Sequence, residues 1–480
     1  MRLMNRPNHI FLITVDALRA DFLGCIGSGT NLTPNIDKLS KRSVVFTRAF
    51  ANGPGTNQSF PAILSSTYFL MHGGMRLLPG FTTLAQVLSN NSFKTVAFHS
   101  NPFLSKGLGW ERGFSEFYDF MDVIKSPSAF ITRQQDAKLG GRLARLASTF
   151  LQAHRSARIQ WFLRKTYFRF SRLQIPYLEG KKLNSEVIRW IEKNKKTKFF
   201  LWMHYMDPHY PYMPPERYLS DFSSRQEAFS FNLSADHKKP SKDDMEVLKS
   251  LYSGEVKYVD ACIGEFLRYL EDNGLLENSL ILIVADHGHA FMEHDKFSHP
   301  YDILYNEVLH IPFILYGLEP SKSVNASVQL LDVPPTITDL LNVKKPPSFM
   351  GESLVPLIKG SEHATPLISE SATPDLINLR YNTSEKAVSC IVGEWKLIIN
   401  EMLNSVELYN IKRDFEEKNN VGPTEKTRVG ELEQLIRKHL INERLRKTKQ
   451  VLHSRAQTFS KGSAGKMLLM NLKKSYEAEE

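Results

Sequence analysis

The stretch SLILIVADHGHAFMEHDKFSHP, residues 279–300, decides the fold. It opens with an apolar, β-branched run over residues 280–285 and becomes polar at once with Asp286 and His287. A short continuous apolar run predicts a strand that is buried on both faces of a sheet. In open α/β sheets, ligands bind where such strands leave the sheet. Because Asp and His both ligate divalent metals, the stretch predicts a metal site at that edge.

The same pattern recurs at other apolar runs in the chain. A polar turn with surface histidines would explain one such strand end. It does not explain several, and in a doubly wound sheet such ends converge on one edge. We therefore expect an α/β fold with a doubly wound, mostly parallel central sheet flanked by helices. The predicted strands and the polar residues that follow them are 9–15 with Asp16, 93–98 with His99 and Asn101, and 198–205 with Asp207 and His209.

Thr56 lies at a further predicted edge position, directly after the turn Gly53-Pro54-Gly55 that follows a strand at 44–51. The next residues, 59–66, have the pattern of a helix start with proline in its first turn. A hydroxyl at such a place suits a nucleophile, because the amides at a helix N-terminus stabilise an anion. The alternative is an ordinary turn or N-cap threonine.

Composition restricts the partners of the protein. The chain has 480 residues, 42% of them hydrophobic, and a formal charge of +10, which favours anionic substrates or surfaces. It carries no zinc-finger spacing and no RNA-binding signature, so no nucleic acid partner is expected. Its three cysteines lie far apart without a CxxC motif, which predicts no disulfide framework and favours a reducing compartment. No apolar run approaches the roughly 20 residues of a membrane span. We expect a cytoplasmic protein, with peripheral membrane association left open.

Pattern changes along the chain predict its organisation. Residues 1–365 form the catalytic α/β domain, interrupted by a basic helical insertion at about 122–182. Residues 366–445 form a small α+β unit with an antiparallel sheet, and 446–480 form a basic tail. Segment 141–173 mixes basic and aromatic residues, which is typical of an amphipathic helix that contacts an anionic membrane or polymer. The alternative is a solvated insertion that packs its aromatic residues on the body.

Taken in order, several motifs resemble the sulfatase-like branch of the alkaline phosphatase superfamily, which includes sulfatases, phosphonate monoester hydrolases and phosphoglycerol transferases. The resemblance covers most of residues 10–421, and leaves 122–182 and the tail unmatched. It implies a metal-dependent enzyme that cleaves an anionic ester. The motifs are VDALRAD, TPNIDKLSKRSVVFTRAFA, GPGTNQSFPAILSS, MDPHYPY, ADHG with EHDKFSHP, LLDVPPTITDLL and GEWKLI.

The resemblance also implies roles for individual residues. Asp16, Asp286 and His287, with the oxygen of Thr56, stand where the family holds its metal, here one divalent ion (Mn, Mg, Ca or Zn). Thr56 stands at the nucleophile position. His209 and His299 stand where the family contacts the ester and protonates the leaving oxygen, and His99 and Asn101 stand at a substrate-binding strand end.

Two departures from the sulfatase pattern bear on the reaction. Sulfatases open with two adjacent aspartates, but Ala17 follows Asp16, and their nucleophile is a Cys or Ser that becomes formylglycine and precedes an arginine. Thr56 cannot form that aldehyde and no such arginine follows it, so we expect cleavage of a phosphate-type ester through threonine.

The two-zinc relatives in the superfamily carry an Asp-x-x-x-His pair at a strand end as ligands of a second metal. Here that strand end reads Asp207-Pro208-His209, which lacks the spacing, so one metal is favoured. The alternatives are sulfuric ester hydrolysis without formylglycine, or a non-catalytic protein that binds an anionic glycan or lipid.

Overall fold

The computed structural model describes residues 2–3, 7–27, 29, 31–73, 75–120, 177–222, 224–235, 240–361, 365–375 and 380–459. Segment 141–173, for which membrane contact is predicted, lies outside these residues, as do most of the insertion and residues 460–480. None of the helices in the described part combines the length and the apolar character that crossing a membrane requires.

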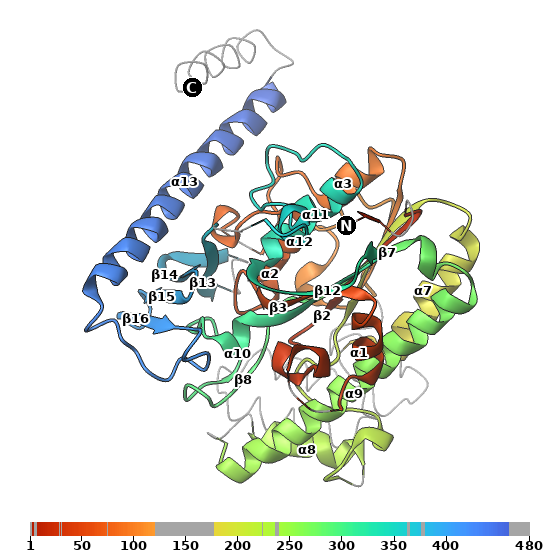
Figure 1. Ribbon diagram of the computed structural model, residues 1–480, viewed down its shortest axis with the longest axis horizontal. Coiled ribbons are helices and arrows are strands. Elements are labelled where there is room, and N and C mark those ends of the chain that lie inside the picture. Colours follow the sequence, from red (N-terminus) through yellow and green to blue (C-terminus); the bar gives the residue numbers. More distant parts are fainter. Residues whose placement is uncertain are drawn as a thin grey trace, which may run out of the picture.

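An eight-stranded sheet forms the centre of the molecule (Figure 1). Its strand order is β12-β3-β10-β7-β2-β6-β4-β5, and β10 alone runs antiparallel to its neighbours β3 and β7. The mostly parallel sheet predicted from the sequence is thus confirmed. The strands are β2 His9–Val15, β3 Ser43–Phe50, β4 Lys94–Phe98, β5 Glu116–Tyr118, β6 Phe199–Tyr205, β7 Ser279–Ala285, β10 His310–Tyr316 and β12 Lys322–Gln329.

Helices cover both faces of this sheet, with α2, α3, α11 and α12 on one side and α1, α7 and α9 on the other (Figure 1). Every residue of β2, β6, β7 and β10 is buried, because helices exclude water from both faces. The helices of this part are α1 Pro34–Ser40, α2 Thr56–Ser65, α3 Leu84–Ser89, α7 Gly180–Asn194, α8 Arg225–Ala235, α9 Lys242–Asp272, α10 Asn306–Leu309, α11 Val333–Leu340 and α12 Val355–Ile358. Short strand pairs are β1 Arg2–Leu3 with β11 Leu318–Glu319, and β8 Ala290–Phe291 with β9 Phe297–Ser298.

The long helix α9 shows how sequence places these layers. It begins at a capping box in which the Ser241 and Asp244 side chains bond each other's backbone amides. Its apolar residues recur at helical spacing, and Phe266 packs edge-on against Phe11 of β2 with ring centroids 5.5 Å apart. The periodic apolar face therefore fixes α9 against the centre of the sheet.

One predicted loop is a helix instead. The polar composition of residues 223–243 predicts an irregular segment, but α8 occupies 225–235. The Asn232 side chain accepts from the Tyr212 amide at 3.0 Å and donates to the Tyr212 carbonyl at 2.9 Å, while the Tyr210 hydroxyl donates to the Asn232 carbonyl at 2.6 Å. These tertiary hydrogen bonds stabilise a helix that its own polar sequence does not signal.

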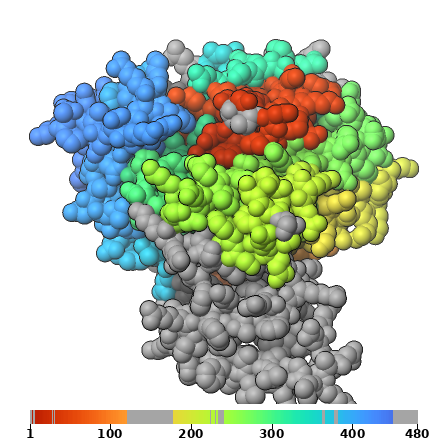
Figure 2. All heavy atoms as spheres, turned by 90° about the horizontal axis from the view of Figure 1, so that it is seen from below, coloured from red at the N-terminus to blue at the C-terminus, as the bar shows by residue number. Residues whose placement is uncertain are grey.

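The C-terminal part is the predicted small antiparallel sheet with a helix, and it lies to one side of the central sheet in Figure 1. In Figure 2 its blue residues form one edge of the molecule. The helix α13 spans Lys426–Phe459, longer than the predicted 431–445. The extension follows from the sequence, since no glycine or proline interrupts residues 431–459. The strands, in sheet order, are β13 Leu367–Asp375, β14 Arg380–Val392, β15 Trp395–Asn400 and β16 Ser405–Asn410.

Candidate active site

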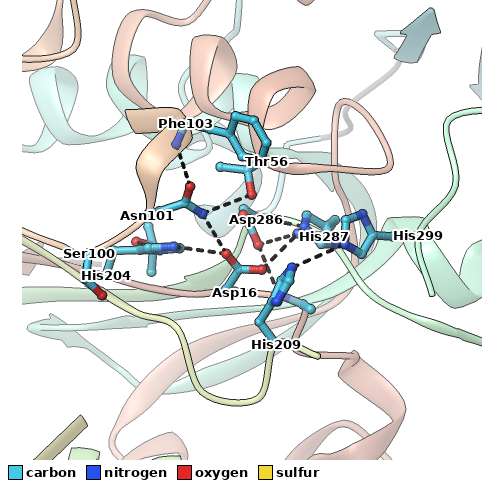
Figure 3. Close-up of polar contacts among 12 residues, drawn as sticks. Asp16, Thr56, Ser100, Asn101, Phe103, His204, His209, Asp286, His287 and His299 are labelled. Carbon is cyan, nitrogen blue, oxygen red and sulfur yellow. Dashed lines mark hydrogen bonds and ion pairs between the residues drawn. The ribbon is translucent and has the colours of Figure 1, made fainter. Parts of the chain in front are cut away.

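Two neighbouring strands bring the acidic residues of the site together. Strands β2 and β7 are parallel and in register, with Val15 opposite Ala285, so Asp16 and Asp286 leave the sheet side by side. Both are fully buried. The backbone amides of Ala17 and His287 donate to Asp286 Oδ1 at 3.1 and 2.9 Å, which fixes that carboxylate (Figure 3). The predicted convergence of strand ends is thus observed for this pair.

Thr56 is the first residue of α2, which begins three residues earlier than the predicted start at residue 59. The preceding turn requires glycine: a Cβ on Gly53 would lie 2.2 Å from Gln58 Cβ and 2.7 Å from the Glu370 carbonyl oxygen. Pro61 therefore lies inside the helix, where it removes one main-chain hydrogen bond near the N-terminus of a fully buried segment. The turn thereby places Thr56 near Asp16 and Asp286 (Figure 3).

Asn101 links the carboxylate to the hydroxyl. Its Nδ2 donates to Asp16 Oδ2 at 3.0 Å and to Thr56 Oγ1 at 3.4 Å (Figure 3). Its Oδ1 accepts from the Phe103 amide at 3.0 Å, which determines the orientation of the amide group. The threonine hydroxyl therefore accepts from Asn101.

His209 and His299 face each other across the site. Their Nε2 atoms are 3.4 Å apart, and His209 Nδ1 donates to the Tyr210 carbonyl at 2.5 Å. The His299 ring also packs 4.4 Å from that of His287. Burial, together with the nearby imidazoles of His287 and His209, holds the pKa of His299 well below its usual range. His299 is therefore neutral at neutral pH in this arrangement.

A cavity of about 190 Å³ opens onto these groups. Its walls are largely aromatic and amide side chains, and no lysine, arginine or carboxylate lines it in the part of the chain that the structure describes. The lining residues that carry the argument below are Thr56, Asn101, His209, His299, Tyr301 and Tyr381.

The structure does not place His99 with these groups, although the sequence predicts a substrate contact. The His99 ring is fully buried, stacks on Trp202 at 5.2 Å and packs edge-on against Phe117 at 5.1 Å. Neither ring nitrogen has a hydrogen-bond partner in the described residues, and burial lowers the pKa of His99 strongly. His99 belongs to the aromatic core below the site, while Asn101 from the same predicted strand end reaches the cavity.

His204 is a site residue that the sequence analysis missed. It lies within β6 and is buried between Asp16 and Thr14: its Nε2 is 3.2 Å from Asp16 Oδ2 and its Nδ1 is 2.8 Å from Thr14 Oγ1. Burial by itself would raise the pKa of Asp16. The electrostatic effect of His209 and the hydrogen bond from His204 outweigh burial and hold that pKa well below its usual range. Because Asp16 is then a carboxylate, His204 donates a hydrogen bond to it through Nε2. His204 Nδ1 then accepts a hydrogen bond from the Thr14 hydroxyl.

Three buried atoms that can ligate a metal and lie close to one another have no hydrogen-bond partner among the described residues: Asp16 Oδ1, Asp286 Oδ2 and His287 Nε2. The nitrogen lies 3.5 Å from the first oxygen and 3.7 Å from the second. Such separations suit donors that share one ion at about 2.0–2.2 Å. Burial and the charge of Asp16 raise the pKa of Asp286 to about 7, because two carboxylates lie close together without a cation. These residues fit a divalent metal.

His204 also lies close enough to be considered as a ligand, since one of its nitrogens falls within 4.8 Å of oxygens from both Asp16 and Asp286. Its two nitrogens, however, are already hydrogen-bonded, whereas His287 Nε2 is not. The orphaned atoms therefore favour His287 as the ligand and His204 as the residue that orients Asp16.

An open α/β sheet with polar groups gathered at the carboxyl ends of its strands is the arrangement of an α/β protein that binds its ligand at that edge. The chain belongs to the Sulfatase family, which it matches over residues 8–343, and residues 293–447 match the family described as N-sulphoglucosamine sulphohydrolase, C-terminal. The arylsulfatase of Clostridium perfringens is 24% identical over 392 residues, which cover 74% of this chain and 79% of that protein. Arylsulfatase K of Gallus gallus is 22% identical over 90% of this chain and 82% of its own length.

The fold of a solved relative agrees with this assignment. The phosphonate monoester hydrolase of Agrobacterium radiobacter superposes with a TM-score of 0.66 at 18% identity, covering 92% of this chain and 96% of that one. The family generally uses a divalent metal ion, which agrees with the donors found here.

The orienting role of His204 predicts a metal phenotype. His204→Leu removes the donor that holds Asp16 Oδ2, so we expect metal affinity and activity each to fall about 10- to 100-fold. The metal dissociation constant is measured by competition with a chelator, and activity by initial rates at saturating metal. Thr14→Val, which removes the hydroxyl behind His204, is expected to give a smaller loss of the same kind. Unchanged metal affinity in both variants would contradict the assignment.

Proposed function

We propose that the protein cleaves a phosphate-type ester that carries one negative charge, using Thr56 as the nucleophile and one divalent metal. The observation that carries the proposal is the position of Thr56 Oγ1: it accepts a hydrogen bond from Asn101, at the N-terminus of α2, beside three orphaned metal donors. Asp16, Asp286 and His287 would hold the metal together with Thr56. A bound divalent ion supplies Lewis-acid stabilisation of negative charge at this position.

The residues of the chain prepare the threonine for attack. Asn101 orients the hydroxyl by donating to Oγ1, and Thr56 lines the cavity. Thr56 is the first residue of α2, and the positive end of the helix dipole favours the negative charge that develops on the ester oxygens. Attack of Oγ1 on phosphorus, with loss of the hydroxyl proton, breaks the bond from phosphorus to the leaving oxygen, which departs as the protonated alcohol. The product is a covalent Thr56 ester, which water or an alcohol releases.

His209 is the better candidate to protonate the leaving oxygen. Its Nδ1–H donates to the Tyr210 carbonyl, so Nε2, which faces the cavity and His299, is the atom through which His209 can pass a proton. The neutral His299 cannot serve as a cationic acid, but its ring can accept that proton or contact the ester. We assign the general acid to His209 and the ester contact to His299.

The charge of the cavity supports a monoanionic substrate. A phosphate monoester carries nearly two negative charges at neutral pH, and its recognition calls for an arginine or lysine. None lines the described part of the cavity, whereas Tyr301 and Tyr381 offer aromatic walls. A phosphate diester or a phosphonate monoester, each with one charge, fits these walls better. Two carboxylates and an imidazole suit Mn²⁺ or Zn²⁺ better than Ca²⁺, which prefers oxygen ligands alone.

Sulfuric ester hydrolysis is the second candidate. A sulfate ester is also a monoanion, and the relatives that share most of the chain are named sulfatases. Under this proposal Thr56 would act without conversion to formylglycine, which a threonine side chain cannot form.

A comparison of chromogenic substrates decides between these two candidates. Rates are measured on a phosphate monoester, a phosphate diester, a phosphonate monoester and a sulfate ester, with Mn²⁺, Mg²⁺, Ca²⁺ or Zn²⁺ added in turn. We expect the phosphate diester and the phosphonate to be cleaved fastest, with Mn²⁺ or Zn²⁺. Release from the sulfate ester alone would favour the second candidate, and fastest cleavage of the monoester would contradict the charge argument.

A further inference from the structure

The β-hairpin that carries His299 into the site has a strained backbone. Strands β8 and β9 pair in antiparallel fashion within residues 290–298, and His299 follows directly (Figure 3). Three non-glycine residues of this hairpin, Met292, Asp295 and Ser298, have φ values of 71°, 56° and 72°. Such conformations are uncommon for residues with a side chain and persist only where the surrounding structure imposes them. The contacts of the hairpin must therefore hold it in this shape.

Arg19 anchors one side of the hairpin. Its Nη1 donates to the His289 carbonyl at 2.9 Å and to Glu293 Oε1 at 2.6 Å. Its Nε and Nη2 donate to the two carboxylate oxygens of Asp21, which fixes the guanidinium plane. The arginine side chain is only 10% exposed, so water competes weakly with these hydrogen bonds. Because Arg19 lies three residues after Asp16, it links the segment that carries this metal donor to the hairpin.

His294 anchors the tip of the hairpin. Its Nδ1 lies 2.7 Å from Glu307 Oε1, and its Nε2 lies 3.1 Å from the Glu417 carbonyl oxygen. Both partners are acceptors, so both nitrogens donate, and an imidazole that donates through both nitrogens is positively charged. Burial by itself would lower the pKa of His294, but the hydrogen bond and charge of Glu307 outweigh burial and raise that pKa to about 9. The ring also stacks on that of Tyr305, with centroids 3.7 Å apart.

The two partners of His294 are themselves held in place. Glu307 belongs to α10, and its own carbonyl accepts from the His289 amide at 2.8 Å, so α10 contacts the hairpin at its base as well as at its tip. Glu417 forms a fully buried ion pair with Lys396 of β15 at 2.7 Å. Breaking such a pair leaves an uncompensated buried charge, so Glu417 is fixed in position. The C-terminal part thus reaches the active-site hairpin through the Glu417 carbonyl.

We propose that Arg19 and His294 are positioning residues, which fix the hairpin and so hold His299 in contact with the ester. This inference rests on the proposed function, because it takes the ester contact that is assigned to His299 there. Neither residue lines the cavity, so each would act through His299. A displacement of about 1 Å can lower a rate by about 100-fold, so the anchors bear on the reaction. The competing account is that they stabilise the fold without any bearing on His299.

A double-mutant cycle separates the two accounts. Initial rates are measured with His294→Phe, with His299→Ala and with both together, on the chromogenic ester that wild type cleaves fastest. Phenylalanine keeps the stacking on Tyr305 and removes both hydrogen bonds. We expect each single substitution to lower kcat about 10- to 100-fold. The double variant should differ from His299→Ala by no more than about twofold, because the anchor acts through His299. Effects that multiply, or a wild-type rate in His294→Phe, would overturn the proposal.

A second variant tests the anchor at Arg19, and it does not depend on whether His294→Phe folds. Glu293→Ala removes a partner that is 31% exposed, and it should show the same non-additivity with His299→Ala. Glu293→Gln keeps an oxygen that can accept from Arg19 and should recover part of the rate. His439→Phe is the matched control, because His439 also pairs with a glutamate, 2.6 Å from Glu370, but between α13 and β13. Any effect of that control should multiply with the effect of His299→Ala.

Hydrogen exchange measured by mass spectrometry gives a readout that does not depend on turnover. Peptides that cover residues 288–299 should exchange faster in His294→Phe and in Glu293→Ala, while peptides from β10 should keep the wild-type exchange. Unchanged exchange over 288–299 in both variants would overturn the proposal whatever the rates. Absence of turnover in wild type would instead refute the proposed function, so the two failures give different results.

Discussion

Thr56→Ala is expected to lower turnover of every ester that the protein cleaves by on the order of 10⁴-fold or more, because the attacking oxygen is removed. The substitution deletes a hydroxyl that accepts a hydrogen bond from Asn101, and leaves the turn and α2 intact. Alanine is also a good helix former at this position. Fold and metal affinity should therefore remain close to wild type, as measured by circular dichroism and chelator competition.

Two companion variants make this result specific. Thr56→Ser keeps the nucleophilic oxygen and should retain most of the activity, whereas Thr197→Ala changes an exposed threonine and should have no effect. Under the proposed mechanism, wild-type protein quenched during turnover carries the transferred group on Thr56, which peptide mass spectrometry detects. Residual turnover within 10-fold of wild type in Thr56→Ala would assign the nucleophile elsewhere, for example to water.

Asp286→Asn is expected to lose both metal and activity. Its Oδ1 accepts from two backbone amides while its Oδ2 is the orphaned atom, so an amide at this position presents a donor or a weaker ligand to the ion. We expect active-site metal affinity to fall by on the order of 100-fold or more, since even residues behind the ligands contribute 10- to 100-fold. Active-site metal affinity is measured by chelator competition, and activity by initial rates.

The control is Asp272→Asn, which alters an exposed aspartate at the end of α9 and should change neither quantity. Chelation of wild-type protein should reproduce the loss of activity, and re-addition of Mn²⁺ or Zn²⁺ should restore it only where Asp286 is present. Full activity in a chelated sample from which the active-site metal is demonstrably removed would rule out the metal-assisted reaction.

Much of the fold could be predicted from local sequence. The apolar runs that form β2, β6 and β7 are continuous because both faces of the sheet are covered, and the first polar residue after each run marks its end. That regularity is sufficient to place Asp16 and Asp286 at one edge of the sheet. The turn before Thr56 could also be predicted from the sequence, because only glycine fits at position 53, where Gln58 approaches so closely.

His204 and His99 show where prediction of site residues from local sequence fails. His204 stands inside an apolar run, FFLWMHY, and reads as a core residue. The parallel register that sets it opposite Thr14 brings it beside Asp16. His99 stands at a predicted strand end and reads as a site residue, yet its ring packs on Trp202. Side chains near the end of a strand point to alternate sides, and only packing decides which side faces the site.

The sequence by itself determined three things: the class of sheet, which polar residues follow each strand, and the residue types available for chemistry. Periodicity and turn preferences are local properties of the chain, so they can be predicted from it. The tertiary structure alone decided which of those groups meet. Asn101 reaches Thr56 across 45 residues of sequence, His204 reaches Asp16 across 188, and His439 reaches Glu370 across 69. Such contacts depend on strand register and on helix packing, which a local pattern does not encode.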